Sequence, residues 1–253
     1  MNEDNAPPQR HPTGPRLGGP EPSPPGGNRP HAIDLLLVLA ITAGLYVLVG
    51  TLVDAPEITV GFILTMLAIQ SAIPMAAVYL VVIRRRGLSW QDLGLRAVGS
   101  RWIPRAAVIA LIALPVVALV NLATQAVTGA PFRNPQLDML APEGFTWSGL
   151  LGMLVMVGIV APIVEEIVFR GLLYGWLRPK LGVSLGAGLS ALAFAAAHGI
   201  GMLIPALFVI GLILTWVYER SGSLWPPIIV HGVFNMVMTI ALYAALAAGV
   251  SLQ

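Results

Sequence analysis

Cysteine is absent from the 253-residue sequence, and charged residues make up only 10% of it. The absence of cysteine excludes disulfide bonds, thiolate metal ligands and a cysteine nucleophile. A soluble domain carries about 25% charged residues, and with 57% hydrophobic residues this chain does not belong to that class. The net charge is only +2, so the composition gives no support for nucleic-acid binding. These shortages indicate an integral membrane protein.

Large apolar side chains are almost missing from the first thirty residues, which hold nine prolines and five glycines. Such a segment cannot bury enough surface to offset its chain entropy. We therefore predict a disordered tail over residues 1–30 and a membrane domain over 31–253. A secretory signal would place a short apolar stretch in this tail, so we expect the first hydrophobic segment to be a retained anchor.

Apolar stretches long enough to cross a bilayer as helices recur through the rest of the chain. The fold class predicted is all-α, a polytopic transmembrane bundle. The fourth stretch is too long for one perpendicular crossing and the fifth is too short, so we expect seven spans, with eight as the alternative. The predicted spans are 33–53, 58–83, 103–127, 147–176, 184–198, 202–218 and 225–249.

Arginines predict the orientation, because residues 84–105 hold six of them and loops rich in basic residues stay in the cytoplasm. Alternation then places the N-terminus of this multi-pass protein in the cytoplasm, with the chain in the cell membrane. Within the basic loop, "LSWQDLGLR" has Ser89 and Asp92 spaced as a helix start. We expect a cytoplasmic interfacial helix there.

Very few ionisable or strongly polar residues lie deep in apolar context, where an ionised side chain costs roughly 2.5 to 3.5 kcal/mol. From the fourth span onward they are Glu165, Glu166, Arg170, His198, His231 and Asn235. Each is a functional-site candidate for that reason. Acidic residues at span ends or in loops (Asp34, Asp54, Asp138 and Glu143) are expected to be solvated.

Helical spacing places the side chains of the two adjacent glutamates on different faces of the helix. Glu166 and Arg170 are four residues apart and share a helix face, which predicts a buried ion pair. Glu165 points about 100° away and has no cation at that spacing. A buried carboxylate without a cation is a candidate general base or acid.

Two further pairs repeat the same spacing. His231 and Asn235 project together from the last span, and Phe194 and His198 do so from the fifth. A base carboxylate, a histidine that orients water and two donors aimed at a developing tetrahedral oxygen fit hydrolytic acyl transfer. Counted from the predicted span ends, however, Glu165 and His198 fall at different depths.

Several alternatives stay open at this point. Zinc is one, because His198, His231 and Glu165 are ligand types that zinc accepts, although the HExxH signature of zincins is absent. Asn235 is also a candidate for a purely structural contact between helices. Intramembrane Glu, Arg and His also build the relays of ion- or proton-coupled transporters. A non-catalytic membrane protein would keep the fold without needing a free base.

Three motifs in this order resemble a known family. "EEIVFR", "FAAAH" and "HGVFN" are similar to the intramembrane motifs of the CAAX-protease and bacteriocin-processing family, also called CPBP or Abi. The likeness covers about residues 85–240, with a catalytic core over about 147–240. It implies an α-helical membrane endopeptidase of about eight spans, whose better-known members remove the last three residues of prenylated proteins.

The resemblance also implies roles for the matching residues. Glu165 and His198 would activate the attacking water, and His231 and Asn235 would stabilise the oxyanion. Glu166 and Arg170 would support the site, with Phe194 beside His198. The partner would be a membrane-associated peptide or protein within the lipid bilayer, and the favoured mechanism needs no cofactor. The substrate is left open, since the likeness extends to bacteriocin maturation and immunity.

Overall fold

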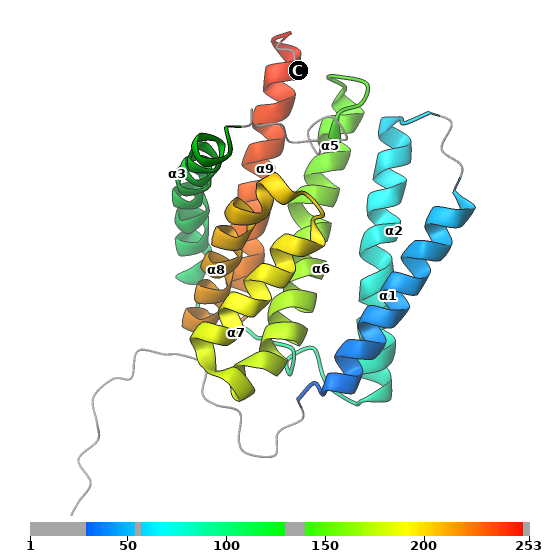
Figure 1. Cartoon of the computed structure of the whole chain (residues 1–253), viewed down its shortest axis with the longest axis vertical. Helices are drawn as coiled ribbons and strands as arrows, with labels where there is room; N and C mark the ends of the chain where they lie inside the picture. Colours follow the sequence, from blue (N-terminus) through cyan, green and yellow to red (C-terminus); the bar gives the residue numbers. More distant parts are fainter. Residues whose placement is uncertain (1–28, 54–56, 130–139, 250–253) are drawn as a thin grey trace, which may run out of the picture.

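The computed structural model describes residues 29–53, 57–129 and 140–249. In this part of the chain every regular element is a helix, as the composition predicted (Figure 1). Residues 1–28 of the tail predicted over 1–30, together with Asp54 and Asp138, lie outside the described residues.

The chain begins with α1 (Ala32–Leu52) and α2 (Val60–Val78), which continues into the π-helical η1 (Tyr79–Arg85). After α3 (Trp102–Thr128), one long helical stretch holds the elements that carry the first motifs. It consists of α5 (Trp147–Val155), η2 (Met156–Val160), α6 (Ala161–Glu166), η3 (Ile167–Tyr174) and α7 (Gly175–Ala197). A 3-10 turn, η4 (Gly201–Leu203), leads into α8 (Ile204–Ser221), and α9 (Trp225–Ala247) ends the bundle.

Among the described residues, six helical stretches are long and apolar enough to cross a membrane, and their bounds follow the predicted spans closely. The chain is therefore a multi-pass membrane protein. The stretch Trp147–Ala197 is 51 residues long and reverses at Gly182, whose φ of 77° and ψ of 177° are not helical. The prediction of seven to eight crossings counts the two arms of this stretch separately, and it stays a prediction.

Local sequence signals account for most helix ends. Thr59 and Thr146 accept hydrogen bonds from Phe62 N and Gly149 N, which caps the starts of α2 and α5. Gly222 closes α8 with a φ of 69°, a conformation that costs other residues more. Prolines occupy the first turn of α9, where no backbone donor is lost.

The helices that carry the three motifs pack around one another. Helix α9 contacts α6 and η2, and α7 contacts η3, while α8 and α3 pack beside them. In Figure 1 the α1–α2 hairpin lies on the opposite side of α5 and α6 from α3. A Cβ atom on Gly211 would meet the Cβ of Ala191 at 2.9 Å, so small side chains bring α7 and α8 into close contact.

The predicted interfacial helix is not confirmed. Ser89 and Asp92 do form the expected reciprocal bonds, with Ser89 N at 2.8 Å from Asp92 Oδ2 and Asp92 N at 3.2 Å from Ser89 Oγ. Only turns follow over residues 90–94, ending at Gly94 with a φ of 104°. Leu93 is fully buried, and its carbonyl oxygen lies 2.7 Å from the position that a Cβ on Gly171 would take. Burial of Leu93 in the bundle therefore replaces the expected position on the membrane surface.

The expectation that Asp34 is solvated is wrong. Its side chain is fully buried and accepts a hydrogen bond from His31 N at 2.8 Å. Arg85 and Arg86 approach its carboxylate from the end of η1, each at 3.5 Å. The arginines that predicted the orientation therefore also tie the start of α1 to the end of η1.

Candidate active site

Glu165 and Glu166 lie in α6, a short α-helical segment between the two π-helical segments η2 and η3. Pro162 has no backbone N–H, so the Gly158 carbonyl one turn earlier lacks its usual helical donor. That carbonyl lies against Gly232 of α9, where a Cβ would meet it at 2.6 Å. Local π-helical geometry occurs often at functional sites, and here it sits on both sides of the carboxylates.

The predicted ion pair between Glu166 and Arg170 is present. Arg170 Nη1 donates to Glu166 Oε1 at 2.9 Å, and both side chains are fully buried. Arg170 Nη2 donates to the Gly211 carbonyl of α8 at 3.1 Å. His231 Nδ1 lies 2.9 Å from the same Glu166 oxygen. The pair thus connects three helical segments that are distant in the sequence.

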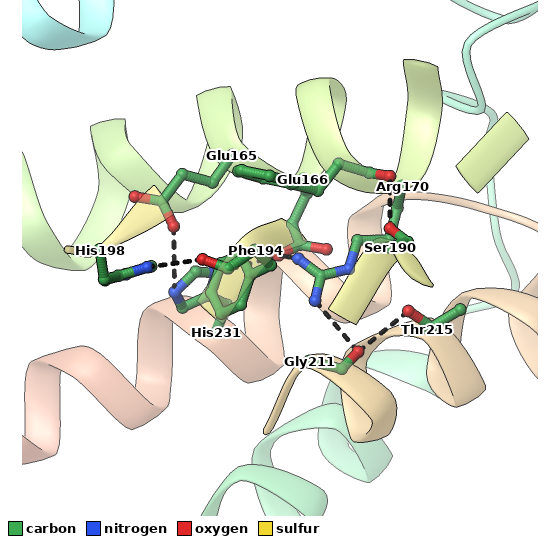
Figure 2. Close-up of polar contacts among 10 residues, drawn as sticks. Glu165, Glu166, Arg170, Ser190, Phe194, His198, Gly211, Thr215 and His231 are labelled. Carbon is green, nitrogen blue, oxygen red and sulfur yellow. Dashed lines mark hydrogen bonds and ion pairs between the residues drawn. The ribbon is translucent and has the colours of Figure 1, made fainter. Parts of the chain in front are cut away.

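Glu165 has a different environment. Its side chain is 29% exposed, and its Oε2 lies 3.7 Å from His231 Nε2, as Figure 2 shows. That separation is too long for a hydrogen bond, and Oε2 has no hydrogen-bond partner among the described residues. The carboxylate oxygen and the imidazole nitrogen therefore face each other, and each can take a further partner.

Hydrogen bonds assign the tautomers of both histidines. His198 Nδ1 lies 2.8 Å from the Phe194 carbonyl, and because a carbonyl only accepts, Nδ1 carries the proton. Glu166 already accepts from a guanidinium and acts as a carboxylate, so His231 Nδ1 donates to it. In the neutral form each ring keeps a lone pair on Nε2. Both histidines can therefore accept a proton at the site.

Phe194 is the common neighbour of the charged and imidazole groups. Its ring centroid lies 4.8 Å from that of His198 and 5.7 Å from that of His231. The Arg170 guanidinium lies 4.6 Å from the same ring. Phe194 is 1% exposed, so a buried phenyl ring brings the second motif into contact with the first and the third.

The different depths expected for Glu165 and His198 are reconciled by the reversal at Gly182, which returns the chain toward α6.

Asn235 does not point to the same partner as His231. Its Nδ2 donates to the Val157 carbonyl of η2 at 3.0 Å. This is a contact between two helices, and such a structural role was the alternative that the sequence analysis left open for Asn235. A carboxamide nitrogen has two hydrogens, so one N–H remains for a second acceptor.

The zinc alternative has a geometric test. Among the described residues, no group of three or more His, Cys, Asp or Glu lies close enough to hold a metal ion. Glu165, His198 and His231 thus do not form a ligand set in this arrangement, and we derive no step through a metal.

Sequence reasoning did not single out two polar residues of α1, Tyr46 and Thr42. The Tyr46 hydroxyl lies within electrostatic range of the Glu165 carboxylate and donates to the Gln70 carbonyl of α2 at 2.6 Å. Thr42, one turn earlier, has a buried hydroxyl oxygen without a hydrogen-bond partner among the described residues. Two polar side chains four residues apart in the apolar middle of this helix were the sequence feature that could have identified them.

Comparison with known proteins finds similarity in the part of the chain that carries the three motifs. Residues 147–237 match the family described as type II CAAX prenyl endopeptidase Rce1-like. Residues 147–237 are therefore called the Rce1-like segment. It contains all seven candidate site residues predicted from the sequence, and the resemblance inferred from the three motifs is confirmed.

Three curated relatives match segments of similar length. A putative membrane peptidase, YdiL, of Bacillus subtilis is 28% identical over 88 residues, which cover 35% of this chain and 36% of the relative. The membrane-embedded CAAX protease MroQ of Staphylococcus aureus is 33% identical over 85 residues, 31% of this chain and 34% of the relative. An uncharacterised 24.3 kDa protein of Escherichia coli is 35% identical over 83 residues, 31% of this chain and 38% of the relative. The chain therefore matches little more than a third of each relative's length, and no solved structure matches it.

Proposed function

We propose that this protein is an intramembrane endopeptidase that hydrolyses a peptide bond near the C-terminus of a membrane-associated substrate. The Rce1-like segment and the name of the CAAX protease relative support a protease. The prenylated C-terminus is the substrate class that the family description suggests. The protein would act in the cell membrane with its N-terminus in the cytoplasm.

One observation carries the proposal: Glu165 is partly exposed and its Oε2 faces His231 Nε2 at 3.7 Å, while its neighbour Glu166 is fully buried in an ion pair. A carboxylate that takes part in packing alone would be paired like Glu166. Among the described residues Glu165 forms no ion pair with an arginine or a lysine, and such a carboxylate is suited to accept a proton from water.

The proposed reaction needs only water and the peptide. Glu165, with His198, accepts a proton from water as the water oxygen bonds to the peptide carbonyl carbon. His231 and the remaining N–H of Asn235 donate to the oxygen that becomes negative. His231 takes the proton for this from solvent, because its Nδ1 proton is committed to Glu166 and the proton held by Glu165 is needed by the leaving amine. The C–N bond then breaks, and the proton held by Glu165 passes to the leaving amine.

Glu165→Gln tests the proposal. The purified full-length protein is incubated in detergent with membrane-anchored peptides that do or do not carry a prenyl group, and products are identified by mass spectrometry. We expect cleavage by the unaltered protein and a loss of roughly 10²- to 10⁴-fold in Glu165→Gln, the usual contribution of general base catalysis. Glu143→Gln is the matched control, since Glu143 is an exposed loop carboxylate, and it should retain full activity.

Full activity in Glu165→Gln would contradict the mechanism. Cleavage that is abolished by a chelator and restored by zinc would favour the metal alternative. Absence of cleavage with every peptide, combined with Glu165-dependent proton uptake in vesicles, would favour the transporter alternative over an enzyme.

A further inference from the structure

A groove away from the candidate active site lies at the start of α3. It encloses about 410 Å³. The residues that line it come from the loop before α3, from its first turn and from the end of α8: Ala97, Val98, Gly99, Ser100, Arg101, Trp102, Arg105 and Ser221. None of them is a residue of the candidate site, and none lies in the Rce1-like segment except Ser221.

The groove carries two positive charges that form no ion pair with an acidic side chain in the described residues. Arg101 and Arg105 are exposed. Neither forms an ion pair with an acidic side chain in the described part of the chain, unlike Arg85, Arg86, Arg170 and Arg178. Ser100 and Ser221 add hydroxyl groups at the same place. The lining is therefore complementary to an anion.

Tryptophans that pack against cations indicate the depth of the groove relative to the membrane. The Arg105 guanidinium lies 5.9 Å from the Trp102 ring. Lys180 lies 4.3 Å from the Trp176 ring, and Arg220 lies 5.5 Å from the Trp216 ring. Figure 1 shows the start of α3, the lower part of α7 and the end of α8 at the same end of the bundle. Tryptophan and basic residues gather where a membrane protein meets the lipid headgroups.

We propose that this groove binds the phosphate of an anionic phospholipid headgroup. Basic pockets between the ends of transmembrane helices recognise lipid headgroups in this way, and guanidinium groups suit phosphate because they donate two parallel hydrogen bonds. The apolar surface of α3 beside the groove, including Ile103 at 57% exposed, is available for the acyl chains of the same lipid. This inference does not depend on the proposed proteolysis.

Native mass spectrometry of the full-length protein in detergent, titrated with phosphatidylglycerol or phosphatidylcholine, tests the proposal. We expect phosphatidylglycerol adducts in preference to phosphatidylcholine adducts. Arg101→Gln with Arg105→Gln should weaken phosphatidylglycerol binding roughly thirtyfold, at about fivefold for each basic residue near an anionic headgroup. Arg101→Lys with Arg105→Lys should retain part of the binding, which separates lost charge from misfolding.

The matched control removes two exposed cations at the same end but outside the groove, Arg84→Gln with Lys180→Gln. It should leave phosphatidylglycerol binding within about twofold of the unaltered protein, a difference smaller than that of one basic residue. Equal weakening in the control and the groove variant would overturn the proposal, because binding would then follow surface charge alone. Displacement of the lipid by millimolar inorganic phosphate would also overturn it, in favour of a site for the free anion.

Discussion

Glu165 and Glu166 are adjacent in the sequence, but they lie in regions with opposite properties. Glu166 is fully buried and its Oε1 is shared by Arg170 and His231, whereas Glu165 is 29% exposed and its Oε2 accepts no hydrogen bond among the described residues. The buried region, formed by Glu166, Arg170 and the Gly211 carbonyl, has its charges paired. The exposed region, formed by Glu165, His198 and His231 Nε2, retains capacity for new partners. The comparison teaches that rotation along one helix is enough to give two adjacent glutamates different burial and different partners.

Removing the cation from the buried region should have the largest effect on stability. Arg170→Met leaves the Glu166 charge buried with only His231 beside it, and an unpaired buried charge costs about 3 to 5 kcal/mol. Thermal unfolding of the purified protein in detergent measures this cost. Glu166→Gln combined with Arg170→Met should recover most of the loss, because no buried charge remains. If the double variant is no more stable than Arg170→Met, charge pairing is not what the buried region contributes.

Asn235→Ala tests whether Asn235 stabilises the oxyanion or only joins two helices. If its free N–H stabilises the oxyanion, kcat should fall roughly 10²- to 10³-fold, the usual cost of losing one such donor. Loss of the contact to the Val157 carbonyl alone should cost about 0.6 kcal/mol of stability, typical of a hydrogen bond between membrane helices. We expect the large loss of kcat together with the small loss of stability. A stability loss with unchanged kcat would assign Asn235 to the support of the bundle.

Gly232→Ala tests how closely α9 must approach η2 to place His231. The added Cβ would lie 2.6 Å from the Gly158 carbonyl, so the backbone must move. Overpacking of this kind costs about 1 to 3 kcal/mol. Gly188→Ala is the control, because a Cβ there meets nothing within 4 Å. Equal unfolding temperatures for the two variants would show that this contact is not tight.

Tyr46→Phe should have the smallest effect. It removes the hydroxyl that donates to the Gln70 carbonyl, which is worth about 0.5 to 1.5 kcal/mol. If α1 contributes to the exposed region, cleavage should also slow by a few-fold beyond any change in protein yield. Unchanged cleavage kinetics would limit the role of Tyr46 to joining α1 and α2.

Spacing within a single helix could be predicted from the sequence. The pair Glu166 and Arg170 was expected from its four-residue separation and is present at 2.9 Å. The membrane-capable helices also follow the expected ranges, because hydropathy over about 20 residues depends little on tertiary contacts.

Contacts between helices were harder to predict. The backbone reversal at Gly182 and the π-helical segments around α6 alter the depth of the motif residues and the direction of their side chains. Neither feature follows from hydropathy. Asp34 was expected in solvent because it lies at a span end, but Arg85 and Arg86 from another element allow it to be buried. The buried position of Leu93 likewise depends on α9 and η3, which are distant in the sequence. These errors share a cause, since each depends on which partner the fold brings close.

The ring of Phe194 lies against two imidazoles and a guanidinium. The positions of His198 and His231 are therefore correlated through a shared neighbour, although they belong to different helices. A peptide that pushes one imidazole aside must tilt the phenyl group and so disturb the other. If a substrate enters as proposed, both histidines would therefore shift together, before any bond is made or broken.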